Sequence, residues 1–91
     1  MLEWFIKVKK KFIVYILRTS GNTLYTGQTN DLKKRLSKHR AGTGAKYMRL
    51  FKSFELVYQE NFETRSEAMK REAEIKKLTK KQKEKLFFKS S

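Results

Sequence analysis

The stretch LYTGQTNDLKKRLSKH, residues 24–39, joins the end of a predicted strand to a predicted helix. The cluster TND at residues 29–31 is rich in helix-capping side chains, so a helix is expected to follow and to run to about Arg40. At about 100° per residue, Arg35 and His39 fall on the leucine side of this helix, while its lysines point to the flanks or the back. An arginine on an inward face must pair with a carboxylate or line a polar cleft that an anion enters.

Three strands are predicted around this helix. Residues 12–18 are rich in β-forming side chains, and residues 23–27 form the returning strand of a hairpin, because the intervening TSGN has turn chemistry. Residues 54–60 alternate apolar Phe54, Leu56 and Tyr58 with polar side chains, which predicts a third strand.

Three further helical segments complete the predicted order. The basic residues 43–53 are expected to form a short loop or helical turn. Thr64 begins a capping box, TRSE, before a helix that runs to about Lys77, and Thr79 caps a last helix through Phe88. The order β-β-α-α-β-α-α in 91 residues predicts an α+β fold, a three-stranded antiparallel sheet flanked by helices.

The composition favours a polyanionic partner. The net charge is +14, from 23 basic and 9 acidic side chains, and nucleic acid is the first candidate, ahead of an anionic membrane surface. The longest apolar run, residues 12–17, is far too short to span a membrane, so we expect no membrane attachment. With no cysteine and no signal-peptide pattern, we expect a cytoplasmic protein without disulfides or thiolate metal sites.

The helix after Thr64 carries a second inward polar residue. Of its glutamates, only Glu72 falls on the apolar face that contains Ala68 and Ile75. A carboxylate on that face needs a cation, either Arg35 or a metal ion.

Two tyrosines of the predicted hairpin add phenol groups to this set. Tyr15 alternates with Ile13 and Leu17, and Tyr25 lies just before Gly27. Buried tyrosine hydroxyls need hydrogen-bond partners and are more often structural than catalytic when taken singly. Two phenols, an arginine, a histidine and one inward glutamate on a strongly basic chain together favour a catalytic site.

This ordered set of motifs resembles the GIY-YIG nuclease superfamily, in particular its small stand-alone bacterial members, the YhbQ-like group. The resemblance is carried by IVY at residues 13–15, YTG at residues 25–27, TNDLKKRLSKH, GAKYMR, ELVYQENF and SEAMKREAEIKKL. It covers about residues 11–88, which we take as a single nuclease domain, and leaves residues 1–10 as an N-terminal extension of unknown role.

The resemblance implies a phosphodiesterase site in which one metal ion, Mg²⁺ or Mn²⁺, is bound by Glu72. By the matching motif positions, Tyr15, Tyr25, Arg35, His39 and Glu72 are the expected catalytic residues. Arg35 is expected to contact the scissile phosphate, and Tyr25 is the first choice for activating the attacking water. Tyr15 and His39 are expected to support it, with His39 as the alternative base because its ordinary pKa is near neutrality.

The expected partner is DNA, with structured or damaged DNA as the expected target and RNA as an alternative, and no protein partner is indicated. Close phosphate approach is expected at Gly27, and backbone phosphates are expected to be bound without sequence readout by the basic and aromatic residues outside the catalytic set. These residues are Lys33, Lys34, Lys38, Lys46, Tyr47, Arg49 and Lys52. Two other functions stay open: a non-catalytic nucleic-acid-binding module with a degenerate nuclease site, and a small RNA- or ribosome-associated basic protein.

Overall fold

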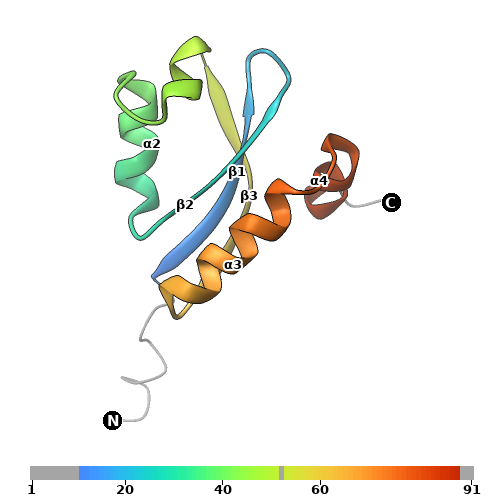
Figure 1. Cartoon of the computed structure of the whole chain (residues 1–91). Coiled ribbons are helices and arrows are strands. Elements are labelled where there is room, and N and C mark those ends of the chain that lie inside the picture. Colours follow the sequence, from blue (N-terminus) through green and yellow to red (C-terminus); the bar gives the residue numbers. More distant parts are fainter. Residues whose placement is uncertain (1–10, 52, 89–91) are drawn as a thin grey trace.

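A computed structural model describes residues 11–51 and 53–88; residues 1–10 and Lys52, which figure in the sequence predictions, lie outside the described residues. Its centre is an antiparallel sheet of β1 (Phe12–Thr19), β2 (Leu24–Thr29) and β3 (Phe54–Phe62). The strand order is β2-β1-β3, so β1 is central and β2 has one open edge (Figure 1). The predicted α+β fold is confirmed.

Side-chain caps determine where the helices begin. Asp31 accepts a hydrogen bond from the Lys34 amide at the start of α2 (Leu32–Arg40). Capping boxes that begin at Thr64 and Thr79 start α3 (Arg65–Lys76) and α4 (Lys80–Phe87), and each box satisfies two amides that would otherwise lack a partner. The basic segment before β3 forms the short 3₁₀ helix η1 (Lys46–Leu50).

The sheet has a separate apolar core on each face. Val14 and Ile16 of β1 pack with α3 and α4 through Ala68, Ile75, Leu86 and Phe87. Tyr15 and Leu17, which alternate with them, pack on the other face with α2 and η1 through Leu32, Leu36 and Met48. The molecule therefore has three layers, with α2 and η1 on one face of the sheet and α3 and α4 on the other (Figure 1). Both faces of β1 are buried, which explains its nearly continuous apolar sequence.

A β-bulge corrects one prediction about β3. Alternation predicts Phe54, Leu56 and Tyr58 on one face, but the pairing with β1 shifts between Ile16↔Tyr58 and Leu17↔Leu56, which leaves Val57 as the extra residue. Phe54 packs in the core beneath α2, Tyr58 packs in the core beneath α3, and Leu56 is 39% exposed. A bulge adds one residue to one strand, so the residues beyond it change face.

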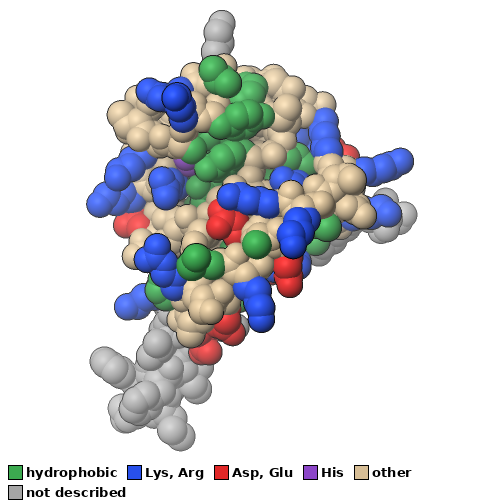
Figure 2. Space-filling model, viewed as in Figure 1, with side chains coloured by type: hydrophobic (Ala, Val, Ile, Leu, Met, Phe, Trp, Pro, Cys, Tyr) green, Lys and Arg blue, Asp and Glu red, His purple; other side chains and the backbone are tan. Residues whose placement is uncertain are grey.

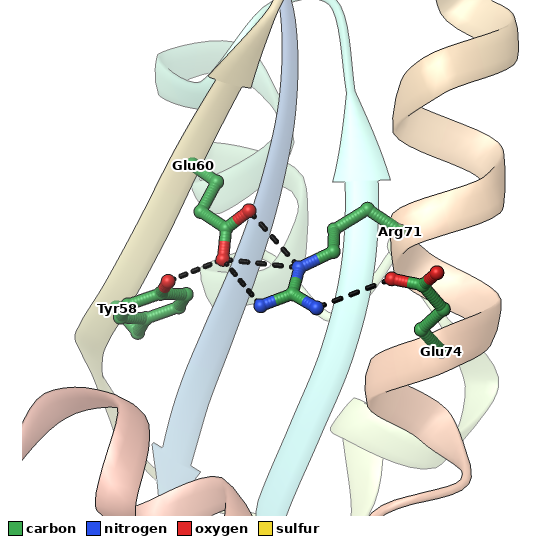
Figure 3. A network of polar contacts seen from close by, with 4 residues as sticks. All are labelled: Tyr58, Glu60, Arg71 and Glu74. Carbon is green, nitrogen blue, oxygen red and sulfur yellow. Dashed lines mark hydrogen bonds and ion pairs between the residues drawn. The ribbon is translucent and has the colours of Figure 1, made fainter.

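A polar network fixes α3 against β3. The Arg71 guanidinium donates to both Glu60 carboxylate oxygens, at 3.0 Å and 2.9 Å for its Nε and Nη2, and to Glu74 Oε1 at 3.2 Å (Figure 3). Tyr58 donates to the same Glu60 carboxylate. Burial alone would raise the pKa of Glu60, but the hydrogen bonds from Arg71 and Tyr58 outweigh it and lower the pKa below its ordinary value of 4.5.

The guanidinium of Arg18 fixes α4 in a similar way. It lies 5.6 Å from the centre of the Phe87 ring and 5.3 Å from that of Phe88, and Glu84 is 4.0 Å away. These contacts hold the last helix beside the strand hairpin. Among residues 11–51 and 53–88, no helix combines the length and the apolar character that a membrane span requires.

Candidate active site

A polar hollow of about 350 Å³ lies at the open edge of β2. Its walls come from both faces of the sheet, because α2 contributes on one side and α3 on the other. Of the sequence-predicted residues, it brings together Tyr15, Tyr25, Gly27, Arg35 and Glu72. The remaining lining residues are Phe12, Gln28, Thr29, Asn30 and Arg65.

Two guanidiniums and one carboxylate provide the charge of this hollow. Arg35 is half-buried and Arg65 is exposed, and neither forms an ion pair with a described residue. The Glu72 side chain is 20% exposed and pairs with Lys76 Nζ at 3.0 Å, one turn along α3. The hollow thus holds two cations that form no ion pair within the described part of the chain, which makes it suitable for an anion such as a phosphate group.

A hydrogen-bonded chain orients the Tyr15 hydroxyl. The Ala45 amide donates to Nδ1 of His39 at 3.4 Å, and the Nε2 atom of His39 lies 3.2 Å from the Tyr15 hydroxyl oxygen. Because Nδ1 accepts, neutral His39 carries its proton on Nε2 and donates it to Tyr15. The hydroxyl proton of Tyr15 is then available to a group in the hollow.

Burial keeps both His39 and Tyr15 uncharged. His39 is 4% exposed, and desolvation, followed by the nearby Arg35, lowers its pKa below 6.5. Tyr15 is 1% exposed, and desolvation, followed by Tyr25, raises its pKa well above the ordinary value. At neutral pH the pair is therefore an imidazole and a phenol, with no charge to balance in the core.

Two glycines make room for these rings. A Cβ atom on Gly27 would lie 2.6 Å from the Tyr15 hydroxyl oxygen, directly across the strand pair. A Cβ atom on Gly44 would lie 2.3 Å from Nδ1 of His39. Gly27 thus has a packing role that sequence reasoning did not identify, in addition to the predicted close approach of phosphate.

Tyr25 connects the hollow to an aromatic row on the outside. The centre of its ring lies 6.4 Å from the ring centre of Tyr15, 5.7 Å from that of His39 and 6.0 Å from that of Tyr47. The rings of Tyr25 and Tyr47 are stacked, with an angle of 15° between their planes. Tyr47 is 41% exposed, and its hydroxyl lies 2.8 Å from that of Thr23. The predicted Tyr47 therefore lies beside the hollow without lining it.

The predicted basic residues surround the hollow at different distances. Lys34 and Lys38 line a second hollow of about 200 Å³ that shares Thr29, Asn30 and Arg35 with the first. Lys33 lies on the outer side of α2, and Lys46 and Arg49 project from η1; all three are exposed. Figure 2 shows lysine and arginine side chains spread over the face that contains α2, α3 and α4, with acidic side chains between them in smaller number.

Arg65 was missed by sequence reasoning. It is the first residue of α3, and its place in the hollow depends on how α3 packs across β2, which helix periodicity does not reveal. A cationic residue directly after a cap, where the helix dipole disfavours it, was the available signal.

The fold and the site define a small α+β domain with a charged hollow at the edge of its sheet. The family model described as the GIY-YIG catalytic domain matches residues 11–85. The chain therefore belongs to the GIY-YIG nuclease family, which confirms the resemblance seen in the sequence. Family membership implies a nucleic-acid substrate and, in general, use of a divalent metal.

Similar proteins place the chain among small stand-alone family members. A UPF0213 protein of Staphylococcus saprophyticus is 47% identical over 77 residues, which cover 85% of this chain and 94% of that protein. A solution structure from E. faecalis shares 49% identity and a TM-score of 0.60, covering 84% of this chain and 81% of that one. The solution structure of the UPF0213 protein of Bacillus halodurans shares 43% identity and a TM-score of 0.54, and the match covers 82% of this chain and 80% of that one.

Proposed function

We propose that this chain is a metal-dependent endonuclease that hydrolyses phosphodiester bonds of DNA. One observation carries the proposal: Arg35, Arg65 and Glu72 share a hollow with Tyr15 and Tyr25, and the two guanidiniums have no ion-pair partner among the described residues. Membership of the nuclease family supports the same reaction class.

The two arginines bind the scissile phosphate in this proposal. A guanidinium presents parallel N–H groups that match two phosphate oxygens, and it keeps its charge at any relevant pH. Arg35, half-buried on α2, faces the reacting group and stabilises the charge that develops in the transition state. Arg65, exposed on α3, holds the phosphate from the opposite wall.

Glu72 is the residue that would hold the metal ion. The described residues contain no group of three or more His, Asp or Glu side chains placed for a metal, so a site supplied wholly by the protein does not fit. A single carboxylate does fit Mg²⁺, which retains several waters and commonly shares its shell with substrate phosphates. When bound, the ion neutralises phosphate charge and makes a bound water more acidic. Lys76 is 57% exposed and can leave Glu72 for solvent.

Tyr25 is the residue we assign to activating the attacking water. It lines the hollow, whereas His39 does not, and both nitrogens of His39 already have partners in Ala45 and Tyr15. Tyr15, kept protonated by burial, donates a hydrogen bond toward the phosphate or the water. His39 acts through Tyr15 and is therefore a positioning residue.

The proposal is tested with flap, fork, nicked and linear DNA in the presence and absence of Mg²⁺ or Mn²⁺. We expect metal-dependent cleavage that falls by about 10² to 10³ in kcat for Arg35→Gln, the range for removal of one transition-state donor. We expect a loss of at least about 10² for Glu72→Gln. Matched controls are Glu74→Gln, which removes an exposed carboxylate from the same helix, and Lys70→Gln, which removes an exposed cation; both should retain cleavage.

The alternative function predicts a different result. Tight DNA binding without product on any substrate or metal would identify a non-catalytic binding module and contradict the proposal. Equal loss of cleavage in Glu72→Gln and Glu74→Gln would also contradict it, because Glu74 lies outside the hollow.

A further inference from the structure

A third hollow, of about 200 Å³, lies where the β1–β2 turn meets the start of α4. It is lined by Thr23, Leu24, Leu78, Lys80 and Lys83 and shares none of these residues with the candidate active site. Two of the five are lysines of α4, and their positions indicate a use for this hollow.

Lys83 reaches from α4 to the sheet. Its Nζ donates to Thr26 Oγ1 at 2.9 Å, and Thr26 itself is 3% exposed. Burial, followed by repulsion from Lys76, lowers the pKa of Lys83. An ammonium held in a half-buried position beside a second ammonium is stabilised when an anion binds near it.

The described residues provide no carboxylate for the two lysines that line this hollow, Lys80 and Lys83. Neither Lys80 nor Lys83 forms an ion pair among them, and Glu84, the acidic residue of α4, lies against Arg18 instead. The hollow therefore has two cationic side chains and no internal counter-ion. The candidate active site also has two cationic side chains without a described ion-pair partner, although it contains the Glu72 carboxylate as well.

Strand β2 connects the two sites. Tyr25 and Gly27 line the candidate active site, and Thr26 between them contacts Lys83. Lys76 lies between the two sites. It pairs with Glu72, and its charge is close enough to Lys83 to lower the pKa of that lysine, so the positive surface continues from one site to the other. A polyanionic strand bound at the arginines can follow β2 toward α4.

We propose that Lys80 and Lys83 form a second phosphate-binding site, which takes another phosphate of the nucleic-acid strand whose scissile phosphate lies against Arg35. The position of the strand rests on the proposed function, but the anion site itself does not. Free inorganic phosphate has the same chemistry, so the experiment must separate the two sources.

Strand binding is measured by fluorescence anisotropy with short labelled single-stranded and duplex DNA, in EDTA so that no cleavage occurs. The variants are Lys80→Gln and Lys83→Gln, and a glutamine at 83 can still hydrogen-bond to Thr26. Each should lower the slope of log K against log salt by about 0.7 on single strands or about 0.9 on duplex. Lys85→Gln, exposed on the same helix and outside the hollow, is the matched control and should leave the slope unchanged.

Free phosphate is tested by NMR titration of the same proteins. Inorganic phosphate should shift the amides of Thr23 and Leu24 in the unmodified chain and in Lys85→Gln, but not in the double variant Lys80→Gln Lys83→Gln. Amide spectra of the unliganded variants establish that they are folded.

Three results would overturn the inference. The first is an unchanged salt slope of DNA binding in both Lys80→Gln and Lys83→Gln. The second is an equal loss of that slope in the control Lys85→Gln. The third is a phosphate-induced shift of the Thr23 and Leu24 amides without any change of the salt slope, which would mean a site for free anions only. The outcome is separate from that of the proposed function. Cleavage with unchanged slopes would refute only the second phosphate site, and lowered slopes without cleavage would refute only the nuclease.

Discussion

Gly44 occupies a position where a side chain would collide with the His39 ring. A Cβ atom there would lie 2.3 Å from Nδ1, the atom that accepts from the Ala45 amide. We therefore expect Gly44→Ala to move the imidazole and to weaken its hydrogen bond to Tyr15. The expected cost is about 1–3 kcal/mol of unfolding free energy, the range for overpacking a tight site, measured by urea denaturation.

A double-mutant cycle controls this prediction. With His39→Ala as background, the added methyl group has no ring to meet, so Gly44→Ala should then cost much less. Equal costs in both backgrounds would show that backbone strain at Gly44, and not the contact with His39, is responsible.

At this residue scale, helix periodicity predicted much of the candidate site. Arg35, His39 and Glu72 were placed on inward faces from spacing alone, and all three are partly or fully buried. Their catalytic roles stay predictions. Arg65 and the steric roles of Gly27 and Gly44 could not be found in this way, because each depends on a contact between residues that belong to different elements.

At the scale of elements, the caps were the most reliable signals in the sequence. Thr64, with its predicted capping box, and Thr79, predicted as a simple cap, both begin helices, since a cap is satisfied by residues three positions away. The bulge at Val57 could not be predicted, because it depends on how β3 pairs with a strand about 40 residues earlier. Local chemistry therefore predicted where the helices begin better than it predicted which residues of β3 share a face.

The network between Glu60 and Arg71 predicts an acid-sensitive contact between β3 and α3. We expect Glu60→Gln to lower the unfolding free energy at pH 7 by about 1–2 kcal/mol, because a charge-assisted hydrogen bond is lost. The pKa of folded Glu60 lies below 4.5, so its contribution is complete above that pH and is lost as the pH falls further. The variant should therefore show a shallower loss of stability in acid, measured by urea denaturation from pH 7 to pH 3.

Glu55→Gln is the matched control for this contact. Glu55 lies on the same strand, is exposed, and forms no ion pair with a described residue. It should leave both the stability at pH 7 and the acid slope nearly unchanged. An acid slope of Glu60→Gln equal to that of the unmodified chain would mean that other carboxylates cause the acid sensitivity.

At the scale of the whole molecule, the charges oppose folding and favour binding. A net charge of +14 in 91 residues repels itself in the compact state, and the described ion pairs neutralise only some of the lysines and arginines. The candidate active site and the Lys80–Lys83 hollow both concentrate cations that lack described ion-pair partners. Anions should therefore stabilise the molecule in two ways, by general screening and by occupying these hollows.

These two contributions can be separated by thermal unfolding in different salts. Raising NaCl at neutral pH should raise Tm through screening, by about 4–8 °C if about 1 kcal/mol of repulsion is relieved. Sodium phosphate at the same ionic strength should raise Tm further, because an anion bound to the folded chain adds stability that grows with its concentration. The additional increase should shrink in a triple variant, Arg35→Gln Lys80→Gln Lys83→Gln, and persist in Lys11→Gln Lys70→Gln Lys85→Gln, which has the same net charge and removes three exposed lysines outside both hollows. A Tm that depends on ionic strength alone, with the same curve for both salts, would mean that the cations act only as a diffuse field.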